Sequence, residues 1–217
     1  MSKKGLFITF EGGEGSGKTT QVNRLAQFLT EKGRKVVTTR EPGGTPEGEK
    51  IRDLLVQRDG GEWNPVSEVL LLFAARTMHV DKIILPALEK GKIVISDRFT
   101  DSTRAYQGYG HKFPLDIIEE LNSMVVGDFA PDITFILDIE TEKGIARSGR
   151  RIAAEALHIK QTEDRFEKME PEFHERLRQG FLDIAKKNPG RCHVIDASLK
   201  PDDIAAKIQK IVTEKIG

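Results

Sequence analysis

The sequence has little cysteine, no excess of charge and no long apolar run. Cys192 is the single cysteine among 217 residues, which excludes an intramolecular disulfide. Lys plus Arg and Asp plus Glu each number 34, so no net basic field exists to attract nucleic acid, and we expect no nucleic-acid partner. The apolar run VLLLFAA (69–75) is far shorter than the roughly 18 residues that span a bilayer, so we expect no membrane partner. We therefore predict a soluble cytoplasmic protein.

Short apolar stretches alternate with amphipathic ones along the chain. We predict five β-strands, at 5–10, 35–39, 92–96, 132–137 and 192–196, because these stretches are apolar or β-branched runs. Apolar residues at helical spacing predict helices over 22–29, 117–125 and 204–212. This alternation predicts an α/β fold: one domain, residues 1–217, with a five-stranded parallel sheet flanked by helices on both faces.

One polar segment interrupts the alternation. SGRRIAAEALHIKQTEDR (148–165) is basic at both ends and lies between helical stretches. We interpret residues from about 148 to 163 as a mobile lid, which could close over a site and exclude water. An ordinary exposed helical connection is the alternative.

A glycine-rich loop follows the first predicted strand. Gly12-x-x-x-x-Gly17-Lys18-Thr19 has the spacing of a phosphate-binding P-loop, residues 12–19, and a predicted helix follows it. Its backbone N–H groups would converge on the phosphates of a nucleoside triphosphate. Lys18 would reach the β- and γ-phosphates, and the Thr19 hydroxyl would bind Mg²⁺. The residues expected to bind this donor are Gly12, Gly13, Glu14, Gly15, Ser16, Gly17, Lys18, Thr19 and Thr20.

Charged residues also follow other apolar stretches. Asp97 ends the strand at 92–96 and is a second candidate to hold Mg²⁺, through water. Arg40, Arg76 and Arg98 each follow an apolar stretch, and guanidinium groups match the geometry of phosphate. Because ligands of α/β sheets bind at the carboxyl ends of the strands, we predict a second anion site there, for a phosphoryl acceptor. Surface arginines, and a surface ion pair of Asp97 with Arg98, are the alternatives.

Five motifs occur in order from residue 7 to about 187: FEGGEGSGKTT, TREPGGTPEGEKIRDLL, LLLFAAR, DRFTDSTRAYQGYG and DRFE. Through them the chain resembles the thymidylate kinase family, bacterial type, which has the P-loop NTPase fold. The resemblance implies transfer of the γ-phosphate of ATP to dTMP, giving dTDP and ADP in dTTP biosynthesis. It also implies Mg²⁺ as cofactor and a homodimer.

The same resemblance assigns roles within an acceptor site. Phe73 would stack on thymine and Arg76 would hydrogen-bond to its carbonyl edge, while Tyr106 would lie against the deoxyribose. Glu14 would face the sugar and accept a hydrogen bond from the 3′-hydroxyl, which explains an acidic residue within a phosphate-binding loop. The residues expected to bind dTMP are Glu14, Arg40, Phe73, Arg76, Arg98, Ser102, Thr103, Tyr106 and Gln107.

The transition state of phosphoryl transfer needs a cation near the migrating group. No arginine occupies the variable P-loop positions 13–16, so by the resemblance the lid must supply one. Arg147, Arg150 and Arg151 are the candidates, with Arg150 or Arg151 favoured over Arg147. The lid is longer than the compact RxRxxxDRxE arrangement, which leaves the assignment to one residue open. Lys18 and Arg98 complete the expected catalytic set.

Two other functions stay open. The more closely related one is a kinase for another pyrimidine monophosphate. Only one methyl group distinguishes dTMP from dUMP, and it is worth only ~1–3 kcal/mol in an apolar pocket. A P-loop switch or ATPase that acts on a macromolecule is the more distant one. The absence of the strings DxxG and NKxD disfavours a regulatory GTPase.

Overall fold

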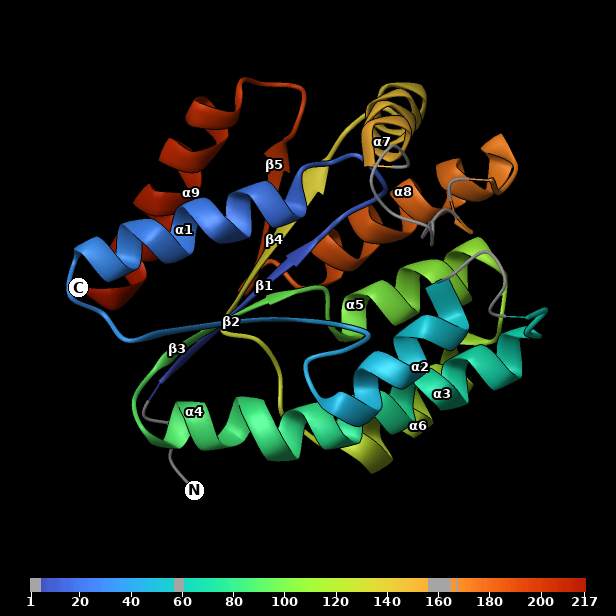
Figure 1. Ribbon diagram of the computed structural model, residues 1–217, viewed down its shortest axis with the longest axis horizontal. Helices are drawn as coiled ribbons and strands as arrows, with labels where there is room; N and C mark the ends of the chain where they lie inside the picture. The colour runs from blue at the N-terminus through green and yellow to red at the C-terminus, as the bar shows by residue number, and fades with distance from the viewer. Residues whose placement is uncertain (1–4, 57–60, 156–164, 167) are drawn as a thin grey trace.

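The computed structural model describes residues 5–56, 61–155, 165–166 and 168–217 (Figure 1). Its centre is a parallel sheet of five strands in the order β2-β3-β1-β4-β5. The strands are β1 (Leu6–Glu11), β2 (Val36–Arg40), β3 (Ile93–Asp97), β4 (Ile133–Asp138) and β5 (Cys192–Asp196). The five predicted strands are confirmed. Because all pairings are parallel, the carboxyl ends of the strands meet at one edge of the sheet.

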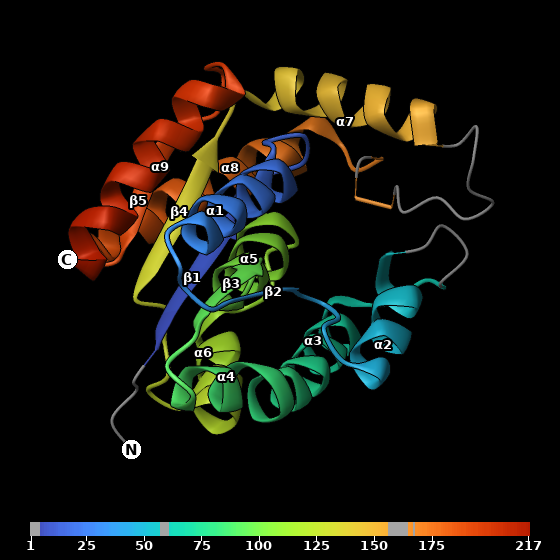
Figure 2. The ribbon, with the colours of Figure 1, turned by 60° about the vertical axis from the view of Figure 1, so that its left-hand side comes forward.

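Helices cover both faces of this sheet (Figure 2). On one face lie α1 (Lys18–Glu31) and α9 (Pro201–Ile216), which pack against each other. The other face packs against η1 (Val80–Ile84), α4 (Leu85–Glu89), α6 (Leu115–Val126) and α8 (Pro171–Lys187). Beyond the sheet edge lie α2 (Pro46–Val56), α3 (Pro65–His79), α5 (Thr100–Thr103), η2 (Arg104–Gly110) and α7 (Thr141–Glu155). The predicted helices and the two-faced architecture are confirmed.

Alternate residues of each strand supply the two halves of the core. Phe7 and Val94 pack on the α4 side, whereas Ile8, Ile95 and Phe135 pack on the side of α1 and α9. This alternation follows from the two-residue repeat of a β-strand, and burial on both sides explains why the strands are almost continuously apolar. No helix among the described residues is long and apolar enough to cross a membrane.

The segment predicted as a lid begins within a helix. Residues 148–155 form the second half of α7, which starts at Thr141, and Ser148 is buried. The helix is amphipathic, with Ile145, Ser148 and Ile152 at helical spacing. The rest of the predicted lid, residues 156–163, lies outside the described residues.

Candidate active site

One cavity of about 300 Å³ lies at the carboxyl edge of the sheet. The P-loop, the ends of β2 and β3, and helices α3, α5, η2 and α7 all contribute to its wall. It brings together thirteen of the residues predicted for the site: Glu14, Gly15, Gly17, Lys18, Arg40, Arg76, Asp97, Arg98, Ser102, Thr103, Tyr106, Gln107 and Arg147. Of the remaining P-loop residues, Gly12 and Gly13 line a smaller neighbouring cavity, Ser16 hydrogen-bonds to the loop, and Thr20 is exposed.

The P-loop folds tightly around the Lys18 ammonium group. Lys18 Nζ donates hydrogen bonds to the carbonyl oxygens of Gly12 at 3.1 Å and Gly13 at 2.8 Å. Burial, together with the nearby Arg98 guanidinium, lowers the pKa of Lys18 to about 8. Gly15 has a φ of +65°, and a Cβ there would lie 2.0 Å from the carbonyl oxygen of Gly144 in α7. Only glycine therefore lets the loop approach α7 this closely.

Glu14 faces Arg98 rather than the interior of the P-loop. Its carboxylate accepts a hydrogen bond from Arg98 Nη2 at 3.1 Å and another from the hydroxyl of Tyr106. Burial opposes its ionisation, but the positive charges of Arg98 and Lys18 outweigh burial and lower the pKa of Glu14. The acidic side chain therefore points across the cavity and balances two cations.

Arg98 is held in position by its backbone as well as by its side chain. It has a φ of +73°, an uncommon conformation for a residue other than glycine, directly after β3. Its guanidinium donates to the carbonyl oxygen of Gly12 at 3.1 Å and to Ser102 Oγ at 3.2 Å, and lies 4.7 Å from the centre of the Tyr106 ring. The guanidinium therefore stands between the P-loop and η2, next to the donor site.

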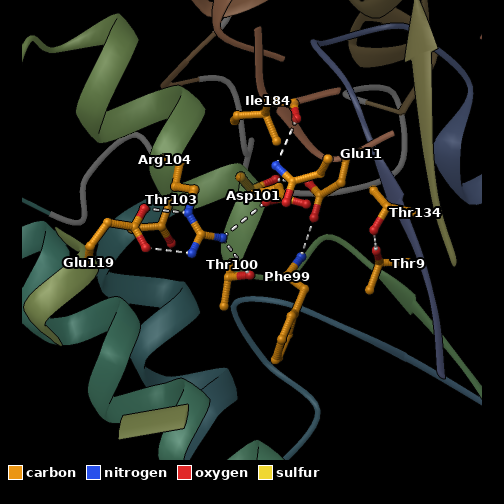
Figure 3. A network of polar contacts seen from close by, with 12 residues as sticks. Thr9, Glu11, Phe99, Thr100, Asp101, Thr103, Arg104, Glu119, Thr134 and Ile184 are labelled. Carbon is orange, nitrogen blue, oxygen red and sulfur yellow. Dashed lines mark hydrogen bonds and ion pairs between the residues drawn. The ribbon is translucent and has the colours of Figure 1, made fainter. Parts of the chain in front are cut away.

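Glu11 is bonded to the turn that follows Arg98, through the backbone of Phe99 (Figure 3). Its fully buried carboxylate accepts hydrogen bonds from the backbone N–H of Phe99 at 2.8 Å and from Ser102 Oγ at 2.5 Å. Burial, and the negative charge of Asp101, raise the pKa of Glu11 to about 8. Asp101 in turn accepts hydrogen bonds from Arg104, which also pairs with Glu119 on α6.

The two predicted magnesium ligands meet. Thr19 Oγ1 donates a hydrogen bond to Asp97 Oδ2 at 2.7 Å, beside Lys18. Hydroxyl and carboxylate oxygens are ligands that Mg²⁺ prefers, and the ion usually completes its shell with substrate phosphates and water. Within the described part of the chain, no cluster of three or more His, Cys, Asp or Glu side chains could hold a metal by itself. A metal at this site would therefore take phosphate or water oxygens as further ligands.

At the far end of the cavity, two polar atoms have no hydrogen-bond partner among the residues that the structure describes. Arg76 is 2% exposed; its Nε donates to Glu41 at 2.8 Å and its Nη2 to Thr103 Oγ1 at 2.9 Å. Among the described residues, neither Arg76 Nη1 nor Gln107 Oε1 has a hydrogen-bond partner. A buried polar atom without a partner is costly, and a ligand that supplies the missing bond recovers that cost.

Phe73 differs from the sequence prediction. Its ring is 3% exposed and packs in the core with Val69 and Ile118, and it is not among the residues that line the cavity. Leu72 lines the cavity instead. Leu72 and Phe73 precede Arg76 by four and three residues, which places both near it on α3, and the Arg76 guanidinium lies 4.9 Å from the centre of the Phe73 ring. The prediction placed the right helix at the cavity, and the stacking of Phe73 on a base stays a prediction.

Several residues of the cavity wall had no predicted role. Arg52 lines it and donates to the carbonyl oxygen of Pro42 at 3.1 Å, while Arg40 is held by Glu49 at 2.8 Å. Phe99 and Phe166 add apolar surface, and Phe166 packs edge-on against Tyr106 at 5.1 Å. The motifs TREPGGTPEGEKIRDLL and DRFE contained Arg52 and Phe166, but nothing in their spacing showed which side chains face inward.

The three candidate lid arginines differ in position. Arg147 lines the cavity, and its Nη1 donates to the carbonyl oxygen of Ala197 at 2.8 Å, in the loop after β5. Arg150 is exposed on α7. The side chain of Arg151 lies outside the described residues.

Together these features define a class of protein. A P-loop with a buried lysine lies at one end of the cavity, and at the other end lie Arg76 and Gln107, each with one polar atom that has no partner among the described residues. This is the site of a nucleoside-triphosphate-dependent phosphotransferase with its own pocket for a small acceptor.

Comparison with known proteins identifies the family. A sequence model of the family "Thymidylate kinase" matches residues 10–208. The chain is 46% identical over 214 residues to a thymidylate kinase of Caulobacter vibrioides, with 99% of both chains covered. It is 47% identical over 207 residues to one of Cereibacter sphaeroides, with 95% of this chain and 94% of the relative covered. The chain belongs to the thymidylate kinase family.

A solved structure supports the same family. The crystal structure of thymidylate kinase from Ehrlichia chaffeensis superposes with a TM-score of 0.75 at 42% sequence identity. The match covers 96% of this chain and 98% of that one. The resemblance predicted from the motifs, the fold class and the enzyme class are therefore confirmed.

Proposed function

We propose that this kinase transfers the γ-phosphate of ATP to dTMP, giving dTDP and ADP. The observation that carries the proposal is the cavity itself, which has a P-loop at one end and, at the other, Arg76 and Gln107, whose Nη1 donor and Oε1 acceptor have no partner among the described residues. Thymine presents a carbonyl oxygen next to its N3–H group. A donor and an acceptor on the protein match that edge.

Apolar and aromatic side chains complete the acceptor pocket. Leu72, Phe99 and Phe166 offer surfaces for the base, in place of the predicted stacking on Phe73. Tyr106 is 5% exposed and tied to Glu14 and Arg98, so it forms a fixed wall against which the deoxyribose packs. A fixed wall has no room to admit a 2′-hydroxyl, which disfavours ribonucleotides.

Arg40 and Arg98 hold the 5′-phosphate of dTMP, and Lys18 with the P-loop N–H groups holds the ATP phosphates. Mg²⁺ neutralises charge on the ATP phosphates when bound, and Thr19 and Asp97 are the residues that would hold it. Glu14 keeps Arg98 pointed into the cavity and faces the sugar of dTMP. The Thr103 hydroxyl accepts a hydrogen bond from Arg76 and so fixes the position of the Arg76 guanidinium next to the base.

A lid arginine stabilises the transition state in this proposal. Arg147 lines the cavity, and Arg150 and Arg151 follow it on α7. Substituting Arg150 and Arg151 by alanine, one at a time, should lower kcat and leave the KM for dTMP nearly unchanged. A change in KM alone would move the transition-state role to Arg147.

The decisive experiment measures ADP release from Mg-ATP with dTMP, dUMP, UMP, CMP, AMP and GMP, one at a time. We expect fast turnover with dTMP and roughly 10- to 200-fold less efficient turnover with dUMP, since one methyl group distinguishes them. Turnover of the other nucleotides should be negligible. ADP release that ignores every monophosphate would refute the proposal.

A homodimer is part of the same proposal. Val66 and Leu70 on α3 are 51% and 52% exposed, and Ile117 and Met124 on the adjoining α6 are 40% and 75% exposed. Apolar side chains this exposed on two packed helices suit burial against a second copy of the chain. Since its donor is ATP, we place the enzyme in the cytoplasm. Sedimentation of wild type against Leu70→Glu would test the dimer, because a charge at the interface should shift it to monomer.

A further inference from the structure

Glu68, in the first turn of α3, is a buried carboxylate outside the cavity wall. It is 2% exposed, and each of its oxygens has a separate partner. Oε2 accepts a hydrogen bond from Gln107 Nε2 at 3.0 Å, and Oε1 accepts one from Arg165 Nη2. A third neighbour, His111, lies 3.9 Å from Oε2, beyond hydrogen-bond distance. Within the described chain, Oε2 is therefore bonded to the cavity residue Gln107.

This contact determines which way the Gln107 amide faces. A carboxylate oxygen only accepts hydrogen bonds, and the other oxygen of Glu68 pairs with the Arg165 guanidinium. The NH₂ group of Gln107 must therefore point at Glu68, and its oxygen must point away. Gln107 lines the cavity and is 3% exposed, and its Oε1 is an acceptor without a described partner.

We propose that Glu68 is a positioning residue that sets the base selectivity of the enzyme by holding Gln107 as a hydrogen-bond acceptor. This rests on the proposed function and deepens it. An acceptor at Gln107 bonds to the N3–H of thymine or uracil. Cytosine has a lone pair at N3, which would face the Gln107 oxygen without a proton between them, so the site rejects it.

Glu68 differs from a member of an ordinary structural ion pair because its second carboxylate oxygen accepts a hydrogen bond from Gln107. Arg165 balances the carboxylate charge, but Arg165 does not touch Gln107 through any contact described above. A purely structural pair would need only the Arg165 bond. The bond to Gln107 instead links a buried charge to a side chain in the cavity wall, so that losing the charge frees the amide to turn.

The test compares dTMP with dCMP as acceptors for wild type and Glu68→Gln. These two nucleotides share the sugar and phosphate, so the ratio of their kcat/KM values isolates the base. A glutamine at position 68 can donate as well as accept, which lets Gln107 present either its oxygen or its NH₂ group. We expect kcat/KM for dTMP to fall and that for dCMP to rise, reducing the ratio on the order of tenfold or more.

A double-mutant cycle distinguishes positioning from a general structural effect. If Glu68 acts through Gln107, Glu68→Gln should no longer change the ratio in a Gln107→Ala background. Glu89→Gln, the same change at an exposed position on α4, is the matched control and should leave the ratio as in wild type. Glu68→Asp, one methylene shorter, should also lower the ratio, and serves if Glu68→Gln does not fold.

The outcomes separate the two proposals. A ratio unchanged in Glu68→Gln and Glu68→Asp, or a change of equal size with and without Gln107, would overturn the role of Glu68 while the enzyme stays a dTMP kinase. Wild-type protein with no turnover of dTMP would overturn both.

Discussion

The two ends of the cavity are built on different principles. At the phosphate end, which we define as the P-loop with Asp97 and Arg98, the polar and charged groups are bonded to one another: Glu14 to Arg98 at 3.1 Å, and Thr19 to Asp97 at 2.7 Å. At the base end, defined as Leu72, Arg76 and Gln107, two polar atoms have no partner among the described residues.

The difference follows from the ligands. The negative charge of a polyphosphate is spread over many oxygens, so any converging cations and N–H groups attract it. Before the polyphosphate binds, the bonds among these protein groups keep them in position. A base offers single donors and acceptors, and a site distinguishes bases by polar atoms that only the right base can satisfy. The phosphate end should therefore control rate, and the base end should control selectivity.

The largest effect should come from the phosphate end. Lys18→Ala removes the cation that the P-loop surrounds, and should lower kcat/KM for ATP on the order of 10³-fold. Steady-state ADP release would measure it, with Lys32→Ala, at the exposed end of α1, as control. A loss below about tenfold would mean that the Lys18 ammonium is not aimed at the ATP phosphates.

The next prediction separates the core from the cavity within one helix. Phe73→Ala should lower the free energy of unfolding by about 3–5 kcal/mol, because the ring is buried in the core. Leu72→Ala should cost less stability but raise the KM for dTMP several-fold. Urea denaturation and acceptor titration would measure both variants. The reverse pattern would restore the sequence prediction that Phe73 faces the base.

Glu14→Gln tests the side of the P-loop that faces the acceptor. Removing the charge loosens Arg98, so the KM for dTMP should rise about tenfold while the KM for ATP changes little. Glu31→Gln, at the exposed end of α1, is the matched control. A larger effect on ATP than on dTMP would contradict the orientation of Glu14 across the cavity.

The last prediction concerns Glu11, which is bonded to the turn after Arg98. Burial raises the pKa of Glu11 from 4.5 to about 8, so the folded state holds a proton that the unfolded chain releases in this interval. The free energy of unfolding should therefore fall as pH rises from 4.5 to about 8. Glu11→Gln should flatten that slope in urea denaturation measured across the interval. If the slope of the Glu11→Gln variant were as steep as that of wild type, a group other than Glu11 would bind the proton.

Much of the phosphate end could be predicted from local patterns. Glycine spacing before an amphipathic stretch located Lys18 and Thr19, and a charged residue after an apolar run located Asp97 and Arg98. Parallel pairing then carries all of them to one edge of the sheet, whatever lies between them in the chain. The base end was predicted less well, since it depends on which face of α3 turns inward and on contacts from α2 and Phe166.

The sequence by itself determined the α/β class, the five strands, the P-loop and the family, because each depends on short patterns whose physical cause is local: strand alternation, glycine backbone freedom, a lysine at a helix start. Only the tertiary structure decided that Leu72 and not Phe73 lines the cavity, that Glu14 pairs with Arg98, and that Glu68 accepts a hydrogen bond from Gln107. Those outcomes depend on how the helices pack. A rotation by one residue about a helix axis exchanges a core side chain for one that faces the cavity, and local sequence patterns do not distinguish the two.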